Sequence, residues 1–388
     1  MAGRTLKNLY HWVTSWVYVV LNGFPASKLV VIGVTGTDGK TTTSHLIYDI
    51  LNVAGVRVAL VSTVGARMGE EEIDTGFHVT NPDAGALQPL LRKIVDRGFT
   101  HLVLEVTSHG LDQNRLVGIP FTIAVLTNVT HEHLDYHGTL ANYLKAKAKL
   151  MRGSRYSILN SDDDSFDYLS FRAGGEVIPY AKTEIKVTNP KLWGDYNKYN
   201  IGAAQATVKK LGINPQVVEH VVNNFSGVPG RREEVELGQK FRALIDFAHT
   251  PNSLKLLLEQ LRSELLVNGW LILVFGCPSL RDATKRPIMG KIAAELADKI
   301  IITAEDPRTE SLEIIYQQIT ANLTNVEMQK VVRQDDRQQA LNQAVHLARV
   351  GDIVVATGKG HEKSMCFGKT EVPWSDREAM EQAIKKVM

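Results

Sequence analysis

A run of glycines, threonines and one lysine near the start of the chain has the composition of a phosphate-binding loop. It follows the apolar stretch 29–34, whose β-branched residues predict a buried strand, and it precedes a helix expected to run from about Thr41 to Val53. Glycines let backbone N–H groups turn toward phosphate oxygens, and a helix N-terminus adds positive potential. Lys40 would reach the outer phosphates, and the Thr41 hydroxyl would bind Mg²⁺. The candidate nucleotide-binding residues are Gly36, Thr37, Asp38, Gly39, Lys40, Thr41 and Thr42.

The spacing of this loop departs from the strict pattern G-x-x-x-x-G-K-[ST], because the first glycine of that pattern would fall on Val34. Gly33 lies one residue too early and Gly36 two residues too late. We therefore predict a variant phosphate loop. The alternative is a glycine-rich turn with a solvated lysine, which the flanking strand and helix disfavour.

Two further segments carry side chains that bind metal ions in proteins. Glu105 ends the apolar run 101–106, and the carboxyl end of a strand in an open α/β sheet is where ligands bind; the alternative is a carboxylate that caps the next turn. The run 130–138 contains His131, His133 and His137, which fit either a zinc site or a solvated polar loop. Lys147 lies on a helix expected over 139–151, where a solvated lysine face is the default interpretation.

These segments and several later ones, taken in order, resemble the motifs of the Mur ligases, which add amino acids to peptidoglycan precursors. The resemblance is greatest to the UDP-N-acetylmuramoyl-tripeptide synthetase branch and covers about residues 29–388. The motifs are TGTDGKTTT (35–43), EVTSHGL (105–111), TNVTHEHLDYHG (127–138), AK (146–147), DFAHTP (246–251), KRP (285–287), DPR (306–308) and GKGHE (358–362).

The resemblance implies ATP and Mg²⁺ as cofactors and assigns their ligands. ATP would phosphorylate a carboxylate to an acyl phosphate, which an amine then attacks. Metal ligands would be Thr41, Glu105, His133 and Lys147, the last as an N-carboxylated lysine that offers an anionic oxygen. The catalytic set would be Lys40, Glu105, His133 and Lys147, with Asn197 on the adenine side and Arg337 facing the phosphate loop from the second domain.

The resemblance also implies two groups of substrate-binding residues. Thr80, Asn81, Thr107, Gln113 and Arg115 would contact the muramoyl-peptide acceptor, with helix or turn caps as the alternative. Asp306, Arg308, Gly358 and Glu362 would contact the incoming amino acid.

Arg308 is the residue that would select the incoming amino acid. A planar guanidinium can hold the distal carboxylate of diaminopimelate through two parallel bonds, while Glu362 receives the amino end. The alternative is a surface pair between Arg308 and Glu310. The loop 276–282 departs from the branch, which usually has two glycines and an aspartate where Pro278, Ser279 and Leu280 stand; a proline also lacks an N–H donor.

The predicted activity is therefore ATP-dependent ligation of a diamino acid, meso-diaminopimelate, to a UDP-N-acetylmuramoyl-dipeptide-like acceptor. The uridine-binding domain that the family carries before the phosphate loop is not expected in this sequence, which leaves two alternatives. One is a related ligase with another acceptor, of the polyglutamate or cyanophycin type. The other is a non-catalytic, ATP-binding partner module. The expected partners are small molecules.

The elements that must position these residues alternate between apolar runs and helical stretches, which predicts an α/β fold. We expect a phosphate-loop ATPase domain with a mainly parallel sheet and then a Rossmann-like α/β domain. Strands are predicted near 29–34, 57–62, 101–106 and 123–128 in the first, and near 243–246, 270–275, 299–303 and 352–356 in the second. The predicted divisions are 1–28, 29–226 and 231–388, with a linker at 227–231 and the active site between the two domains.

Residues 5–22 are expected to form a separate N-terminal helix. Trp12, Trp16 and Val20 recur at helical spacing, but the apolar stretch is shorter than the roughly 20 residues that span a bilayer. A signal peptide is disfavoured, since a loop that needs cytosolic ATP follows closely. A helix packed on the next domain is the first interpretation, and one lying on a membrane surface or a partner is the second.

The composition excludes several classes of protein. The chain has 388 residues, with 44 Lys and Arg against 42 Asp and Glu, so no basic excess points to nucleic acid. Two cysteines, Cys277 and Cys366, exclude a disulfide framework or a Cys-rich zinc module. We expect a cytoplasmic, globular enzyme.

Overall fold

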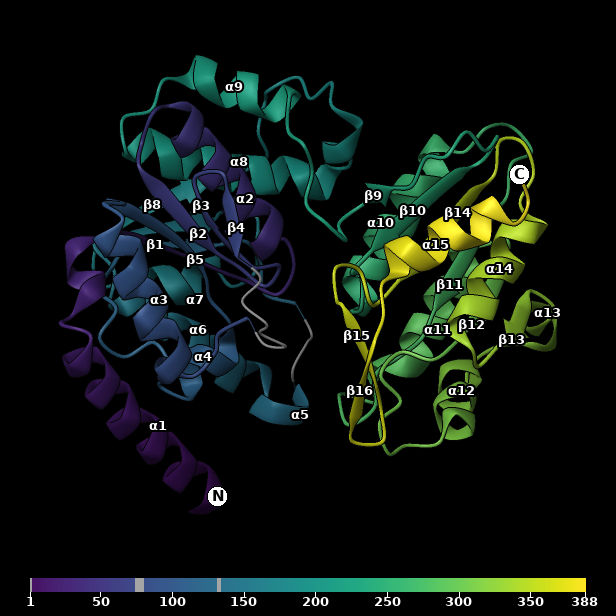
Figure 1. Cartoon of the computed structure of the whole chain (residues 1–388), viewed down its shortest axis with the longest axis horizontal. Coiled ribbons are helices and arrows are strands. Elements are labelled where there is room, and N and C mark those ends of the chain that lie inside the picture. Colours follow the sequence, from purple (N-terminus) through teal and green to yellow (C-terminus); the bar gives the residue numbers. More distant parts are fainter. Residues whose placement is uncertain (1, 74–79, 131–133) are drawn as a thin grey trace. The chain divides into compact units, whose positions relative to one another are not determined.

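A computed structural model of the chain describes residues 2–73, 80–130 and 134–388. The chain divides into two compact units, Met1–Ser226 and Gly227–Met388 (Figure 1). The division falls at the start of the stretch 227–231 that the sequence analysis interprets as a linker. The N-terminal helix lies within the first unit, against helix α3 (Ala84–Asp96), rather than forming a unit of its own.

The first unit is built on one sheet with the strand order β4-β3-β2-β5-β1-β6-β7-β8. The strands are β1 (Val30–Thr35), β2 (Val58–Val61), β3 (Ala66–Met68), β4 (Glu71–Ile73), β5 (His101–Glu105), β6 (Phe121–Leu126), β7 (Tyr156–Asn160) and β8 (Glu176–Tyr180). The neighbouring strands in the part β2-β5-β1-β6-β7-β8 are parallel, while β3 pairs with β2 and with β4 in antiparallel fashion. The register aligns Val34 of β1 with Glu105 of β5 and Val125 of β6, so the carboxyl ends of these central strands share one edge.

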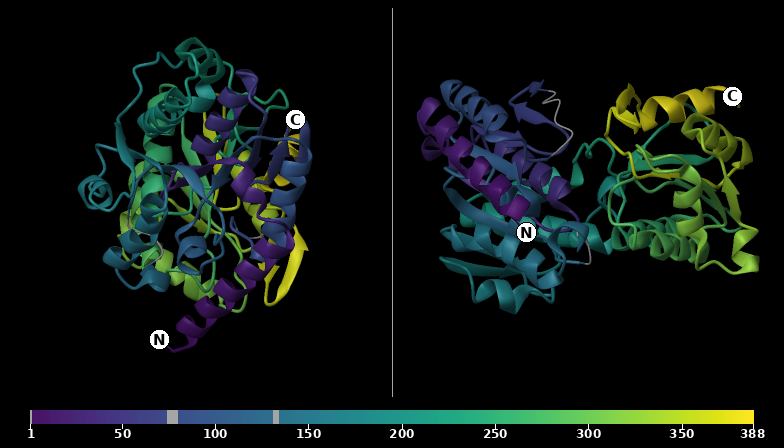
Figure 2. Two further views of the ribbon diagram at one scale, coloured as in Figure 1. Left: turned by 90° about the vertical axis from the view of Figure 1, so that its left-hand side faces the viewer. Right: turned by 90° about the horizontal axis from the view of Figure 1, so that it is seen from below.

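Helices cover both faces of this sheet, as Figures 1 and 2 show, with α2, α8 and α9 on one face and α3, α4 and α6 on the other. The helical segments are α1 (Ala2–Leu21), η1 (Pro25–Lys28), α2 (Lys40–Val53), α3 (Ala84–Asp96), α4 (Ser108–Asp112), α5 (Leu134–His137), α6 (Leu140–Arg152), α7 (Phe166–Ser170), η2 (Pro190–Leu192), α8 (Asp195–Lys210) and α9 (Pro215–Asn223). None of the helices in the described ranges is long and apolar enough to span a bilayer.

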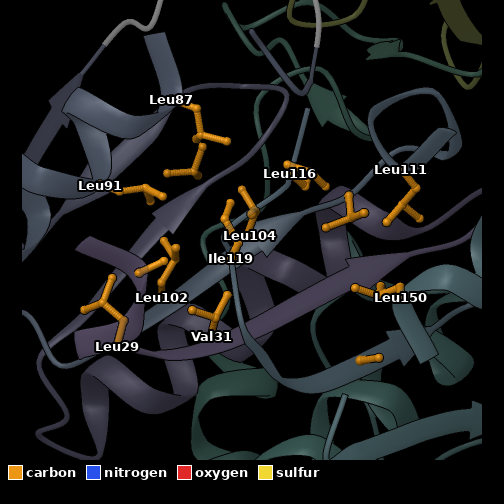
Figure 3. Packing of buried hydrophobic residues seen from close by; sticks show 14 of the residues in the cluster. Leu29, Val31, Leu87, Leu91, Leu102, Leu104, Leu111, Leu116, Ile119 and Leu150 are labelled. Atoms are coloured by element: carbon orange, nitrogen blue, oxygen red, sulfur yellow. The ribbon is translucent and has the colours of Figure 1, made fainter. Parts of the chain in front are cut away.

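The core of the first unit is built from strand residues whose side chains point alternately to the two faces of the sheet. Val31, Leu102 and Leu104 are fully buried on one face of the sheet, where they meet Leu87 and Leu91 of α3 (Figure 3). Burial on both faces explains why these strands are near-continuous apolar runs. The core therefore fixes the sheet rigidly behind the edge at which Glu105 emerges.

The second unit repeats the α/β plan with the strand order β13-β12-β11-β14-β10-β9, in which the edge strand β9 is antiparallel. Its strands are β9 (Glu233–Glu234), β10 (Arg242–Asp246), β11 (Leu271–Phe275), β12 (Lys299–Ile302), β13 (Val331–Arg333) and β14 (Ile353–Thr357), with a separate hairpin of β15 (Ser364–Phe367) and β16 (Thr370–Pro373). Its helices are α10 (Pro251–Glu264), α11 (Lys285–Leu296), α12 (Leu312–Thr320), α13 (Asn325–Met328), α14 (Arg337–Leu347) and α15 (Asp376–Lys385).

The predicted fold class is confirmed, and the eight predicted strands lie within about two residues of those observed. The strands not predicted from the sequence are β3, β4, β7, β8, β9 and β13 and the hairpin β15–β16. Apart from β7 and β8, which have five residues each, they have four residues or fewer, which is too short for a period of two to stand out from turn residues.

Candidate active site

The phosphate loop is hydrogen-bonded to Asn128, which follows β6. The amide of Thr37 donates to the carbonyl of Asn128 at 2.8 Å, and the amide of Asp38 donates to its side-chain oxygen at 3.0 Å. Gly39 precedes α2 with a φ of +80°, and a Cβ there would lie 2.1 Å from the side-chain oxygen of Asn200. Only glycine fits this position, because the backbone is left-handed and a neighbouring element closes on it.

Lys40 and Thr41 open α2 directly behind this turn. The Lys40 ammonium lies over the loop, 2.7 Å from the carbonyl of Thr37 and 3.3 Å from that of Gly36. Thr42 shares the first turn of α2, so the predicted residues 36–42 form one continuous loop and helix start. Because α2 begins at Lys40, its N-terminus faces the loop and adds positive potential there.

Thr41 and Glu105 meet at the sheet edge, although 64 positions separate them in sequence. The Thr41 hydroxyl lies 3.1 Å from both carboxylate oxygens of Glu105, and the amide of Thr63 donates to the same carboxylate at 3.0 Å. Glu105 is 1% exposed, and no Lys or Arg of the described ranges pairs with it. A buried carboxylate with no cation partner is costly unless a cation binds there.

Lys147 is fully buried below the loop rather than on a solvated face. Its ammonium donates to the carbonyl of Gly36 at 2.7 Å and lies 4.5 Å from the ring centre of Tyr143. Burial, followed by the charge of Lys40, lowers the pKa of Lys147 well below its usual range. The default interpretation of Lys147 as a solvated residue is therefore wrong, and it is exposed Lys145 and Lys149 that face solvent.

The histidine run is only partly visible. His131 and His133 lie outside the described residues, so the metal role of His133 stays a prediction. The ring of His137 is buried, and its Nε2 lies 3.0 Å from the hydroxyl of Ser108.

The predicted acceptor residues gather beside Glu105. The Asn81 side chain donates to the carbonyl of Glu105 at 2.7 Å and accepts from the amide and hydroxyl of Thr107 at 2.7 and 2.8 Å. Arg115 donates to the carbonyl of Asn81 at 2.8 Å and to Gln113 at 2.9 Å.

Thr80 belongs to the same group, because its hydroxyl lies 2.8 Å from that of Thr63, whose amide donates to Glu105. All five predicted acceptor residues therefore lie in one cluster, in which Thr107 also caps α4 as the alternative interpretation required.

Asn197 lies in the first turn of α8 and is buried. Its side chain donates to the carbonyl of Trp193 and accepts from Asn200 at 2.9 Å. Because Asn200 also contacts Thr43 and closes on Gly39, Asn197 is linked to the phosphate loop through one residue.

In the second unit, the carboxyl ends of β12 and β14 bring Asp306, Lys359 and Glu362 together. The Lys359 ammonium is 2.9 Å from an Asp306 oxygen and also pairs with Glu362. Asp306 and Arg308 both adopt left-handed φ values, +44° and +45°, on either side of Pro307. Such strain in non-glycine residues persists where surrounding contacts enforce it, which is common at functional sites.

Arg308 is positioned by its backbone. Its amide donates to the carbonyl of Cys366 at 3.0 Å, and its carbonyl accepts from Gly368 at 2.8 Å, so the β15–β16 hairpin fixes the residue. Its Nε is buried without a hydrogen-bond partner among the described residues. Glu310 pairs with Arg286 at 2.7 Å, so the alternative of an Arg308–Glu310 surface pair is wrong.

Gly358 adopts a φ of +101°, and a Cβ there would lie 2.0 Å from an oxygen of Glu305. Burial raises the pKa of Glu305 to about 8, against the opposing charges of Arg337, Lys285 and Lys359. The backbone at the start of the GKGHE motif thus closes directly on a buried carboxyl group.

Arg337 is held by contacts within the second unit. Its guanidinium is fully buried, pairs with Asp376 through two bonds of 2.7 Å, and donates to the carbonyls of Thr357 and Ala304. Because these contacts use the guanidinium, Arg337 holds the ends of β12 and β14 together. The assignment of Arg337 to the nucleotide-binding residues stays a prediction.

Sequence reasoning gave no site role to Thr63, Asn128 or Tyr143. Thr63 donates to Glu105, Asn128 shapes the phosphate loop, and the Tyr143 hydroxyl lies 3.1 Å from that of Thr37. Thr63 comes directly after the predicted strand 57–62, and Asn128 is the last residue of the predicted strand 123–128. Polar residues at strand carboxyl ends were therefore an available signal.

A family model described as Mur ligase middle domain matches residues 34–189, and one described as Mur ligase, glutamate ligase domain matches residues 230–360. The chain is 39% identical to the UDP-N-acetylmuramoyl-L-alanyl-D-glutamate–2,6-diaminopimelate ligase of Synechococcus elongatus, over 93% of this chain and 77% of the relative. It is 34% identical to the ligase of the same name from Bacillus cereus, over 93% and 79%.

Among solved structures, one of a UDP-N-acetylmuramoyl-L-alanyl-D-glutamate–2,6-diaminopimelate ligase matches with a TM-score of 0.60 and 30% identity, over 92% of this chain and 79% of that chain. The folylpolyglutamate synthase of Mycobacterium tuberculosis, complexed with ADP and AMPPCP, matches with a TM-score of 0.74 at 17% identity, over 89% and 92%. At that identity the second likeness shows a shared fold only.

Proposed function

The chain belongs to the Mur ligase family, and from that premise we propose that it joins 2,6-diaminopimelate to UDP-N-acetylmuramoyl-L-alanyl-D-glutamate. This family forms amide bonds in an ATP-dependent reaction and uses ATP and Mg²⁺. The proposed reaction is a step of peptidoglycan precursor synthesis, and its substrates are small molecules. Its demand for ATP favours a cytoplasmic location.

The observation that carries the proposal is the presence of two buried ionisable groups without partners of opposite charge at the edge of the first sheet. Glu105 is a buried carboxylate without a cation partner among the described residues, and Lys147 is a buried amine without an anion at ion-pair distance there. Buried charges are normally paired or coordinate metals. Hard oxygen donors from Thr41 and Glu105 are ligands that Mg²⁺ prefers, so these residues fit the metal.

Lys147 supports a second metal-binding oxygen. The neutral amine is the form that adds to CO₂, giving an N-carboxylate and a released proton, and burial favours that neutral form. N-carboxylation would replace the buried amine with an anion, which would give a metal ion a further oxygen ligand. His133 would complete this set, by the family resemblance alone.

When bound, ATP and Mg²⁺ supply a phosphoryl group that turns one oxygen of the acceptor carboxylate into a leaving group, and a charge that offsets the crowded phosphates. Lys40 would release the carbonyls of its own loop and donate to the outer phosphates. Asn81, Thr107 and Arg115 would hold the acceptor beside Glu105, so that its carboxylate points toward the loop.

Recognition of the amine would rest on Arg308 and Glu362. The Arg308 Nε is buried and lacks an acceptor within the described residues, so a ligand carboxylate would satisfy it. Glu362 pairs with Lys359 and would receive the ammonium end of a diamino acid. A distal carboxylate distinguishes diaminopimelate from lysine, which favours diaminopimelate as the nucleophile.

The test is incubation with UDP-N-acetylmuramoyl-L-alanyl-D-glutamate, ATP, Mg²⁺ and either diaminopimelate or lysine, followed by product mass and ADP release. The expected result is the diaminopimelate tripeptide product with one ADP per product. Folate and amino-acid polymer acceptors serve as a panel for a ligase of another type. ADP release with only a panel acceptor, or ATP binding without ADP from any acceptor, would overturn the proposal.

A further inference from the structure

Helix α1 is oriented with a polar face toward the first unit. His11, Ser15 and Val19 are buried at 7%, 1% and 0% exposure. The Ser15 hydroxyl donates to the carbonyl of Asn114 at 3.0 Å, and the Asn8 side chain donates to the carbonyl of Asp112 at the same distance. These bonds fix which side of the helix meets the domain, and Figures 1 and 2 show α1 along the outside of the unit.

The opposite side of α1 is apolar and exposed. We define the outer face of α1 as Leu9, Trp12, Val13, Trp16, Val17 and Val20, which are 38–59% exposed. They recur at spacings of three, four and seven, so they form one continuous stripe on a helix. The usual arrangement of a surface helix, apolar inward and polar outward, is thus reversed.

Single exposed apolar residues need no explanation, but contiguous patches mark interaction sites. Trp is among the residues enriched where one end of a side chain meets hydrocarbon and the other meets water. Together with the finding that α1 is not long and apolar enough to cross a bilayer, this composition is typical of a helix that lies in an interface.

The charge of the first 28 residues selects the partner of the outer face. The sequence has Arg4, Lys7 and Lys28 before its first acidic residue, Asp38. Lys7 and Lys28 are exposed, and Lys7 lies one helical turn before His11, toward the domain-facing side of α1. Two copies of this stretch would bring like charges together, whereas an anionic surface would offset them.

We propose that α1 binds the surface of an anionic phospholipid bilayer, with its outer face in the region between headgroups and acyl chains. The polar face stays hydrogen-bonded to residues 112–114, so the first unit is held at the membrane without unfolding the helix. This inference does not depend on the substrate of the ligase.

The experiment is sedimentation of the full chain with vesicles made of equal parts phosphatidylglycerol and phosphatidylcholine, and with vesicles of phosphatidylcholine alone. We expect binding to the anionic vesicles, weakened by salt, and a blue shift of tryptophan emission, because two of the five tryptophans lie on the outer face.

Two variants test the contribution of the face and of its charge. The double variant Trp12→Gln/Trp16→Gln should lower vesicle affinity at least about tenfold, and Lys7→Glu about fivefold at low salt. The matched controls are Leu266→Gln/Val267→Gln, which removes exposed apolar residues of the second unit, and Lys240→Glu. Both controls should bind vesicles as the parent chain does.

The outcomes separate lipid from protein partners. No binding to anionic vesicles, or equal binding by the tryptophan variant with unchanged melting temperature, would overturn the proposal. Light scattering tests for a dimer. If the chain bound no vesicles but formed a dimer that the tryptophan variant abolished, the outer face would be assigned to contact with a second copy. Ligase activity in solution should be unchanged by every variant, which keeps this test distinct from that of the proposed function.

Discussion

The two sheet edges that carry the candidate residues handle charge in opposite ways. At the first, Glu105 and Lys147 are buried without partners of opposite sign among the described residues. At the second, Asp306, Lys359 and Glu362 form a chain of ion pairs, and Arg337 is matched by Asp376. Both edges lie at the carboxyl ends of parallel strands, so topology alone does not explain the difference.

The difference indicates what each edge requires. A site with unbalanced buried charge gains by binding ions, as the chemistry of phosphoryl transfer demands. A site whose charges are already paired presents a fixed shape with few free donors, such as the Nε of Arg308. Under the proposed function, the first edge would hold phosphate and metal, and the second would select the amino acid.

Removal of the buried amine of Lys147 is the strongest test of the difference between the two edges. Lys147→Ala should lower kcat by at least about a thousandfold, because several kcal/mol of metal stabilisation would be lost with the N-carboxylate. Lys145→Ala, two positions away on the exposed side of α6, is the matched control and should stay within about twofold. Steady-state ADP release measures both, and equal rates would remove Lys147 from the site.

The largest effect expected at the second edge is on stability. Arg337→Ala leaves Asp376 buried and unpaired, which should lower the free energy of unfolding by about 3–5 kcal/mol. Arg377→Ala, which breaks exposed pairs with Glu233 and Glu381, should cost no more than about 1 kcal/mol. Urea unfolding measures both variants.

A nucleotide-binding role for Arg337 predicts a different pattern. In that case Arg337→Ala would raise the KM for ATP while leaving the urea midpoint unchanged. The double variant Arg337→Met/Asp376→Leu should recover part of the lost stability if the pair is structural.

Titration of Glu305 should sharpen the contrast between the edges. Folding raises the pKa of this carboxyl from near 4.5 to about 8, so the folded chain retains a proton that the unfolded chain loses in between. Its stabilising contribution is complete below pH 4.5 and is lost as pH rises toward 8. The surrounding charged groups are Arg337, Lys285, Lys359 and Glu362.

The variant Glu305→Gln lacks this titration. Between about pH 5 and 7.5 the parent chain should lose roughly 3 kcal/mol relative to it, as linkage requires for a shift of this size. Melting temperatures of both proteins across that range measure the difference. Parallel pH profiles would show that Glu305 is ionised in the folded chain.

The smallest predicted effect concerns selectivity. Arg308→Ala should reduce kcat/KM for diaminopimelate about 10–100-fold, the value of a charge-assisted hydrogen bond, while the KM for ATP changes by less than about twofold. Arg308→Lys should not restore it, because a lysine cannot form two parallel bonds. Arg349→Ala, exposed at a turn before β14, is the control. Equal use of diaminopimelate and lysine before and after the change would contradict the assignment.

Local patterns were enough to predict the phosphate loop, the strands around it and the α/β class. The reason is that glycines, a strand and a helix start are adjacent in sequence, and buried parallel strands are continuous apolar runs. Family resemblance then assigned roles to Glu105 and Lys147 that spacing could not, since Lys147 shares its helix with two exposed lysines.

The sequence by itself determined which residues could do chemistry and which strands carry them to the sheet edges. Only the tertiary structure decided which partners these residues have. Glu105 contacts Thr41, 64 positions away in sequence, Lys147 is buried below the phosphate loop, and Arg337 forms an ion pair with Asp376. The tertiary structure also decided that α1 turns its tryptophans outward. The physical reason is that burial and ion pairing depend on neighbours brought together by packing, and no local pattern records which side of a helix those neighbours will cover.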